Sequence, residues 1–306
     1  MINLFTKCCA IRKILTAKFL IFIGGFMQSS LQNDTEPYIG KNLPQIEFMV
    51  TQEILNDYNE GLNLQYQKTL PLPSMIAGAA DNFHKWSAFE QDRGHLWMRQ
   101  EWQLFKPLNL NEAYIANGKI IDIYKKRDRT VVNTEMALRN LEGTVVIKSN
   151  HHQSFLLDEP IEKVEFRDPA KKEGMRKFLI PDGIAIPSLE SNITLEMCGE
   201  FFHGNKSYHT DLKSSQKLGF NNVVVGGRMT MSYVGHLVEQ HLGEDWWNSG
   251  ELDIKFTNPV WPNDKLFIKG IDIGILKDNN KRRGIFTWIE KDDGTIVLIG
   301  NASIAN

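Results

Sequence analysis

Two stretches of this 306-residue chain repeat one pattern at a nearly constant offset. The first runs from Phe105 to Ile147, and the second runs from Phe256 to Ile299. Residues that correspond at one common offset are Pro107 and Pro259, Glu112 and Asp264, and Gly118 and Gly270. A period of about 150 residues is far longer than the repeat unit of a solenoid. The chain is therefore expected to contain two copies of one domain.

Each copy has the pattern of three strands joined by two tight turns. β-Branched and aromatic residues alternate with polar ones, and Gly, Asp and Asn residues bound each run. The predicted strands cover residues 112–124, 131–138 and 144–149 in the first copy and residues 264–276, 284–290 and 295–300 in the second. Strands that follow one another through such turns predict an antiparallel sheet.

A helix is predicted ahead of each set of strands. In the second copy it begins at Gly227, carries an apolar face and ends at Gly243, because glycine often ends a helix. In the first copy it covers residues 75–89. An apolar helix followed by an antiparallel meander indicates a helix wrapped in a sheet, which is the hot-dog fold. We therefore expect an α+β protein with a double hot-dog fold, in which the two copies pair their sheets.

Four segments are expected along the chain: a leader at 1–35, an N-terminal hot-dog domain at 36–158, a charged linker at 159–188 and a C-terminal hot-dog domain at 189–306. The leader is basic, and its apolar run Phe19–Met27 is shorter than the roughly 20 residues of a membrane span. It can be read as a targeting peptide, as a weak membrane anchor, or as an artefact with the true start at Met27. We expect a cytoplasmic protein, or a mitochondrial one if the leader is a targeting peptide.

Composition excludes several classes of function. The chain has 35 Lys and Arg against 37 Asp and Glu, scattered among one another, so a nucleic-acid partner is not expected. Three cysteines without a CxxC pair argue against a disulfide framework or a zinc site. His151 and His152 have no acid at metal-ligand spacing, and we expect them at the surface. No metal and no cofactor are therefore expected.

One polar motif occurs in the second copy only. The stretch YHTDLKSSQKLGF, from Tyr208 to Phe220, places His209 and Asp211 two residues apart before a short predicted helix. The corresponding position of the first copy is Asp57, so the copies differ here. From the residues alone, the histidine is a catalytic base, a metal ligand or a polar residue at a helix start. The aspartate has the alternative of capping the helix that begins near Leu212.

This motif resembles the signature of the MaoC-like dehydratases, the (R)-specific enoyl-CoA hydratase group. His209 falls on the catalytic histidine of that signature and Asp211 on the acid two residues later. Gly219-Phe220 matches its Gly-Phe pair, and Gly227 matches the glycine of the turn before the central helix. The resemblance extends over both halves, from about residue 40 to the end, and is to the double hot-dog members whose N-terminal half has lost the motif.

The sequence departs from that signature at three places. Gly204 stands where the family has its catalytic Asp, and Lys206-Ser207 stands where it has Asn-Pro. Gly226 replaces the histidine of the turn. Asn205 is the nearest upstream polar side chain, and it could hydrogen-bond a water molecule but could not deprotonate it.

The resemblance implies hydration or dehydration of an acyl thioester carried by CoA or by an acyl-carrier protein. It implies that His209 acts as the base, that the backbone N–H of Gly227 stabilises the oxyanion and that Asn205 assists. Substrate contacts are expected from Tyr208, Asp211, Gly226 and Arg228. The alternatives are a non-catalytic acyl-thioester-binding protein and a thioesterase, which would need a carboxylate on or near the central helix. A homodimer is possible, and no stable membrane span is expected.

Overall fold

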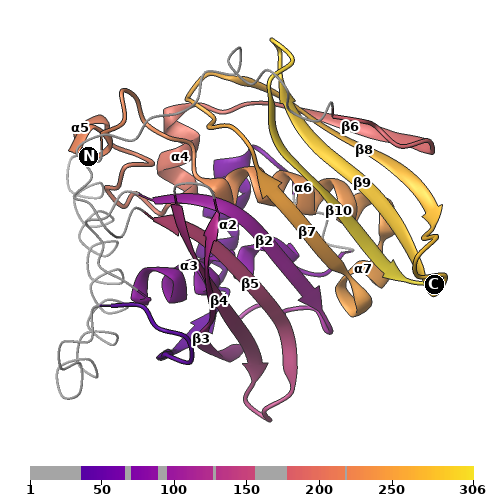
Figure 1. The fold of residues 1–306 in the computed structure, drawn as a ribbon, viewed down its shortest axis with the longest axis horizontal. Helices are drawn as coiled ribbons and strands as arrows, with labels where there is room; N and C mark the ends of the chain where they lie inside the picture. Colours follow the sequence, from indigo (N-terminus) through magenta and orange to yellow (C-terminus); the bar gives the residue numbers. More distant parts are fainter. Residues whose placement is uncertain (1–35, 66–69, 89–94, 127–128, 156–177, 218) are drawn as a thin grey trace, which may run out of the picture. The chain divides into compact units, whose positions relative to one another are not determined.

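A ten-stranded antiparallel sheet forms the frame of the computed structural model (Figure 1). The structure describes residues 36–65, 70–88, 95–126, 129–155, 178–217 and 219–306. The expected leader and most of the expected linker lie outside these ranges. Residues 38–306 form one compact unit. The strands are β1 Asn42–Met49, β2 His95–Leu104, β3 Ala113–Lys126, β4 Arg129–Asn140, β5 Val145–Phe155, β6 Ile184–Asn192, β7 Glu251–Phe256, β8 Lys265–Ile275, β9 Arg282–Lys291 and β10 Ile296–Ala305.

The strand order shows that the two halves are built alike. It runs β1-β3-β4-β5-β2-β7-β10-β9-β8-β6, so the second half repeats the order of the first in reverse across the middle of the sheet. The predicted strands of the two copies correspond to β3, β4 and β5 and to β8, β9 and β10. At the centre β2 pairs antiparallel with β7, from Arg99 opposite Lys255 to Gln103 opposite Glu251. The prediction that the two copies pair their sheets is therefore confirmed.

The helices are α2 Gln52–Leu62, a 3-10 helix η1 Ser74–Ala77, α3 Gly78–Ser87, α4 Leu195–Phe201, α5 Leu212–Lys217, α6 Gly227–Leu242 and α7 Glu244–Ser249. The predicted second-copy helix is α6, and Gly243 ends it with a positive φ of 63°. The first predicted helix is divided into η1 and α3. Helix α3 packs against β1, β3, β4 and β5, while α6 packs against β6, β8, β9 and β10. Each half is thus one central helix wrapped by five strands, an α+β double hot-dog.

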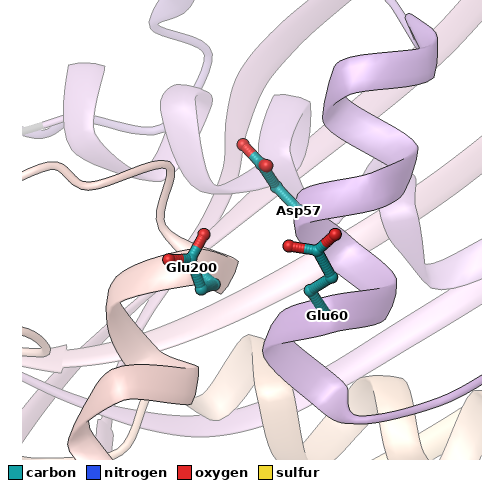
Figure 2. A group of neighbouring side chains, drawn as sticks. All are labelled: Asp57, Glu60 and Glu200. Atoms are coloured by element: carbon teal, nitrogen blue, oxygen red, sulfur yellow. The ribbon is translucent and has the colours of Figure 1, made fainter. Parts of the chain in front are cut away.

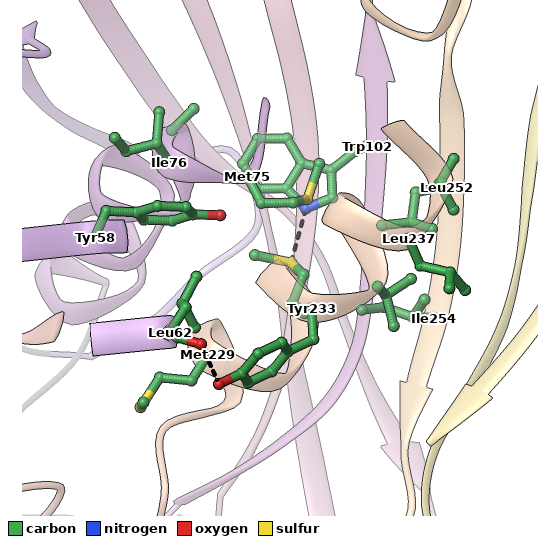
Figure 3. Packing of buried hydrophobic residues seen from close by; sticks show 14 of the residues in the cluster. Tyr58, Leu62, Met75, Ile76, Trp102, Met229, Tyr233, Leu237, Leu252 and Ile254 are labelled. Atoms are coloured by element: carbon green, nitrogen blue, oxygen red, sulfur yellow. Dashed lines mark hydrogen bonds between the residues drawn. The ribbon is translucent and has the colours of Figure 1, made fainter. Parts of the chain in front are cut away.

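The hydrophobic core is continuous between the halves (Figure 3). Trp102 of β2 is 1% exposed, and its Nε1–H donates to Sδ of Met231 on α6 over 3.1 Å. The hydroxyl of Tyr233 on α6 donates to the carbonyl of Leu62 on α2 over 2.8 Å. Buried aromatic area of this kind is a major source of folding free energy. The halves therefore stabilise each other through shared side chains as well as through the β2–β7 pair.

The expectation that His151 and His152 lie at the surface is wrong. Strand β5 continues to Phe155, so both residues lie within the sheet, and they are 0% and 5% exposed. Nδ1 of His151 lies 2.7 Å from Oδ2 of Asp81 on α3, and the Ser149 hydroxyl donates to Oδ1. Burial alone would raise the pKa of Asp81, but the charge and hydrogen bonds of these neighbours outweigh it and lower that pKa. A polar cluster is thus sealed inside the first half.

Candidate functional site

The loop between α4 and α5 positions His209. The backbone N–H groups of Thr210 and Asp211 both donate to the Ser207 carbonyl, which closes a tight turn. The His209 N–H donates to the Ser207 hydroxyl over 3.2 Å. The hydroxyl of Thr210 donates to the Asn205 carbonyl over 2.6 Å. These short-range bonds fix the backbone on both sides of the imidazole.

Two further bonds hold this loop to the segment that leads into α6. His209 Nδ1 lies 2.7 Å from the carbonyl oxygen of Val224, and the Val224 N–H donates to the Tyr208 carbonyl over 3.3 Å. A carbonyl can only accept, so Nδ1 carries the hydrogen. The neutral ring then has its lone pair at Nε2, the tautomer that a general base needs at that atom. The Val225 N–H in turn donates to the carbonyl of Val260, which anchors the segment to the connection between β7 and β8.

The imidazole lies at the start of α6. Its ring stacks on Phe202, with centroids 5.0 Å apart and planes 10° apart. The centroid of the Tyr208 ring lies 3.9 Å from that of the imidazole. A β-carbon added to Gly226, the N-cap of α6, would lie 3.7 Å from Cδ2 of His209 and only 2.5 Å from Cζ of Phe202. Phe202 therefore occupies the space that a side chain at position 226 would need, which accounts for the glycine there.

Gly227 supplies the first amide of α6. The first N–H groups of a helix have no acceptor within that helix, and they lie at the positive end of its dipole. A β-carbon at Gly227 would lie 2.6 Å from the Trp97 ring and 3.3 Å from Phe256. Trp97 belongs to β2, so a residue of the first half packs directly against Gly227. Trp97 also stacks on the buried His151, with centroids 4.4 Å apart.

Asn205 and Asp211 have hydrogen-bond partners within the loop and its flanking helices, and Gly204 has a special backbone conformation. Asn205 is exposed, and its Nδ2 donates to the Phe202 carbonyl at the end of α4 over 2.8 Å. Asp211 caps α5, because Oδ1 accepts from both the N–H and the hydroxyl of Ser214. These hydrogen bonds lower the pKa of Asp211. Gly204 has a φ of +68°, in the left-handed region that favours glycine.

Arg228 follows the glycine pair on α6. Its guanidinium carbon lies 5.1 Å from the Phe201 ring centroid and 5.6 Å from that of Phe202. Its Nε is buried and has no hydrogen-bond partner among the described residues. Burial in this environment lowers the pKa of Arg228 to about 10. Together with His209, Phe202 and Gly226–Gly227, this residue makes up the cluster that we call the α6 tip site.

Two other polar clusters lie away from the α6 tip site. The first is an acidic group of Asp57 and Glu60 on α2 with Glu200 on α4, whose ligand oxygens lie within 4.8 Å of one another (Figure 2). His203 places Nδ1 2.8 Å from Oδ2 of Asp57, which offers that carboxylate a hydrogen-bond donor. Sequence reasoning missed this group because its members come from two halves of the chain.

The second cluster lies further along α6, at Glu239. This residue is twelve positions after Gly227, which corresponds to about 18 Å at the usual helical rise. Glu239 is 4% exposed, and its Oε1 accepts from the N–H and the hydroxyl of Ser74 at 2.8 and 2.6 Å. Burial raises the pKa of Glu239 to about 7, against the lowering effect of these bonds. Tyr58, His236 and Trp247 line a pocket with it. This pocket is therefore separate from the α6 tip site.

Comparison with known proteins adds a family match for the second half. Residues 205–285 match the family model described as MaoC like domain. That range contains the His209 loop, α6 and the first strands after it. No curated protein sequence matches the chain. None of the helices in the described part of the chain is long and apolar enough to span a membrane.

Solved structures match the fold at low sequence identity. The full-length peroxisomal multifunctional enzyme type 2 from Drosophila melanogaster is 14% identical, with a TM-score of 0.66. The match covers 87% of this chain and 48% of the enzyme, so this chain spans about half the length of the enzyme. A MaoC-like dehydratase from Phytophthora capsici is 14% identical, with a TM-score of 0.63 over 86% and 95%. A Mycobacterium tuberculosis protein described as having a double hot-dog fold is 12% identical, with a TM-score of 0.58 over 90% and 99%. The chain therefore has a double hot-dog fold, and residues 205–285 of its second half are similar to the MaoC like domain.

Proposed function

We propose that the protein is a hydratase or dehydratase of acyl thioesters, with its chemistry at the α6 tip site. The observation that carries the proposal is the position of His209. Its ring is held through Nδ1 by the Val224 carbonyl at 2.7 Å and lies beside Gly226, directly before the first amide of α6. A general base and an oxyanion-binding amide are the two groups that addition of water to an enoyl thioester requires.

The proposed reaction interconverts a trans-2-enoyl thioester plus water with a 3-hydroxyacyl thioester. Nε2 of His209 takes a proton from water, and the resulting hydroxide oxygen bonds to C3. The π electrons move toward the thioester oxygen, where the Gly227 N–H donates a hydrogen bond, and C2 then receives the proton from the imidazolium. Since the family aspartate is replaced by Gly204, His209 carries both proton transfers. Asn205 is left out, because its amide is bonded to the end of α4.

Crotonyl-CoA is the probe that tests this proposal. Purified protein is expected to hydrate it, with loss of the enoyl-thioester absorbance and formation of 3-hydroxybutyryl-CoA. His209→Ala removes the base, and we expect kcat to fall by about 10²–10⁴. His203→Asn is the matched control on the same loop. Its φ of 56° suits asparagine, and we place it outside the α6 tip site, so its kcat should stay within about twofold of the wild type.

Other outcomes would assign a different function. Saturable binding of crotonyl-CoA without turnover would leave a non-catalytic acyl-thioester-binding protein. Equal activity of the wild type and His209→Ala would move the chemistry away from the α6 tip site. Either outcome contradicts the proposed roles.

A thioesterase is the second candidate, and the Glu239 pocket is the observation that favours it. A carboxyl group with a pKa of about 7 is matched to general-base work at neutral pH, and His236 lines the same pocket. Release of free CoA thiol from saturated acyl-CoA, abolished by Glu239→Gln and not by His209→Ala, would establish this activity. We rank it second because Ser74 already occupies Oε1 of Glu239 with two hydrogen bonds.

A further inference from the structure

Arg228 has a buried Nε without a partner and no carboxylate in contact, whereas three other arginines of the described chain each face a carboxylate. Arg99 faces Asp253 at 2.6 Å, Arg282 faces Glu251 at 3.3 Å, and Arg283 faces Asp272. Among the residues that the structure describes, Arg228 makes no hydrogen bond and no ion pair, and its Nε is buried without a partner. Its guanidinium lies against the faces of Phe201 and Phe202, and Tyr58 and Asp81 act electrostatically on its charge.

This placement is unfavourable for a cation in two ways. Removing a guanidinium from water without a counter-ion or hydrogen-bond acceptors has a large desolvation penalty. Arg228 is also the second residue of α6, and the N-terminus of a helix favours negative charge over positive charge. Contacts with two aromatic rings compensate for part of this cost. An anion bound beside Arg228 would remove both sources of instability at once.

The neighbouring acid of the first half does not fill this role. Asp81 is the carboxylate whose charge acts on Arg228. Its Oδ2 is bonded to His151, and its Oδ1 accepts from Ser149 and Gln100. Both oxygens are thus committed to the buried cluster of the first half, so the anion for Arg228 must come from outside the described chain.

Phe202 connects Arg228 to the reacting end of the α6 tip site. The same phenyl ring stacks on His209 and lies against the Arg228 guanidinium. Arg228 also follows Gly227 directly, so it is one residue from the proposed oxyanion amide. An anionic group that reaches Arg228 must therefore lie close to the carbons that take up water. The phosphates of CoA lie at the far end of the pantetheine arm from those carbons, whereas a carboxylate on a short acyl chain lies beside them.

We propose that Arg228 binds a carboxylate on the acyl chain, so that the substrate is a short enoyl thioester with a second, free carboxylate. This inference rests on the proposed hydration at the α6 tip site. A five-carbon case is glutaconyl-CoA, whose carboxylate carbon is two bonds beyond C3. Addition of water places the hydroxyl on C3 and the proton on C2, and gives 3-hydroxyglutaryl-CoA without any other reactant. The planar guanidinium can bind such a carboxylate through two parallel hydrogen bonds.

The test compares glutaconyl-CoA with trans-2-pentenoyl-CoA, which has a methyl group in place of the carboxylate. We expect the wild type to prefer glutaconyl-CoA in kcat/KM by at least about tenfold, as charge-assisted hydrogen bonds allow. Arg228→Met keeps a long side chain without the charge. It should lower kcat/KM for glutaconyl-CoA by about 10–100-fold more than it lowers kcat/KM for pentenoyl-CoA. Arg228→Lys should restore part of the preference, and Arg139→Met, at a half-buried position on β4, is the control.

Pantetheine thioesters and saturated thioesters separate the remaining possibilities. If Arg228 bound a CoA phosphate, Arg228→Met would weaken both CoA thioesters equally and neither pantetheine thioester, and the proposal would be overturned. Equal hydration of the two acyl chains by the wild type would also overturn it. If neither thioester is hydrated, the hydratase proposal fails by itself. Calorimetry with glutaryl-CoA and pentanoyl-CoA then decides the Arg228 proposal. Tighter binding of glutaryl-CoA, with the difference lost in Arg228→Met, would support it. Equal binding of the two thioesters would refute it.

Discussion

The protonation of Glu239 makes the stability of the fold depend on pH. Its pKa is about 7 in the folded chain, because burial disfavours the charged form, and near 4.5 when unfolded. Between these values the folded chain holds a proton that the unfolded chain has lost. The stabilising effect of the neutral carboxyl is therefore complete below about pH 4.5 and is lost as the pH rises through about 7.

Glu239→Gln should remove this dependence, because the amide oxygen can still accept the two hydrogen bonds from Ser74 and carries no charge. We expect the variant to be more stable than the wild type at pH 8, by on the order of 3 kcal/mol, and nearly equal to it at pH 4.5. Urea unfolding at both pH values measures the difference. Glu244→Gln, at an exposed position nearby, should show no such trend. A constant difference between wild type and Glu239→Gln at all pH values would contradict the shifted pKa.

Gly227 and Trp97 form a second pair whose coupling can be measured. A methyl group at 227 would lie 2.6 Å from the Trp97 ring, so Gly227→Ala should destabilise the protein by about 1–3 kcal/mol and reduce kcat by moving the amide. Trp97→Phe removes the atoms that clash, and the double variant should recover part of both losses. Thermal unfolding and kcat of all four proteins give the coupling. Strictly additive effects would show that the ring does not constrain the amide.

Sequence patterns predicted some of these residues and missed others for physical reasons. The His209 motif was recognised because its members are close in sequence and tied by local turns. The burial of His151 was missed, because its partner Asp81 lies on a distant helix. A signal was present in Asp81 itself, a carboxylate directly after the apolar run MIAGAA, because a buried carboxylate requires a buried donor. The partner of the Asn205 amide was also missed, since the end of α4 was not predicted.

At the scale of elements, Asp272 fastens the end of α6 to the outer strands. On β8 it accepts hydrogen bonds from Arg283 of β9 and from the Gly274 N–H, and Nε2 of His241 lies 2.8 Å away. Burial would raise the pKa of Asp272, but these bonds outweigh it and hold the pKa at about 2. The ionised Asp272 carboxylate thus stabilises the fold above its unfolded pKa of about 4, and this stabilisation is lost as the pH falls through about 2.

Asp272→Asn should destabilise the protein by about 1–3 kcal/mol at pH 7, a figure kept low because the Arg283 side chain is 45% exposed. The difference from wild type should shrink as the pH falls from 5 to 3. Denaturant unfolding at these pH values tests it, with the exposed Asp278→Asn as control. An effect that grows on acidification would refute the assigned pKa.

The elements differ in how far their patterns predicted them. Strands β3 and β8 alternate buried and more exposed residues, because one face of each packs on a helix. Strand β2 was not predicted, because consecutive polar residues, Arg99 to Glu101, interrupt its pattern at the junction. Strand β6 contains Pro187 and lies at the edge of the sheet, where proline is tolerated.

At the scale of the whole molecule, each half depends on the other for its core. Besides the β2–β7 pair, Trp247 Nε1–H donates to the Leu72 carbonyl over 2.8 Å, and Trp246 Nε1–H donates to the Ser74 hydroxyl over 3.0 Å. Residues 36–158 and 179–306 produced as separate chains should each lack a cooperative unfolding transition, because these groups and Trp102 would be exposed. Co-expression should restore the transition and the hydration of crotonyl-CoA. Independent, cooperative folding of either half, seen by calorimetry, would contradict this dependence.

The contact of Trp97 with Gly227 has an evolutionary consequence. In an assembly of two identical subunits, every substitution appears in both subunits. A bulky ring that packs on the helix of the neighbouring subunit must therefore also fit at the same position of that neighbour. Joining both copies in one polypeptide removes that double requirement. The two halves of this chain differ accordingly: the first half has Asp57 at the position that corresponds to His209, and it supplies the Trp97 ring that packs against Gly227 of the second half.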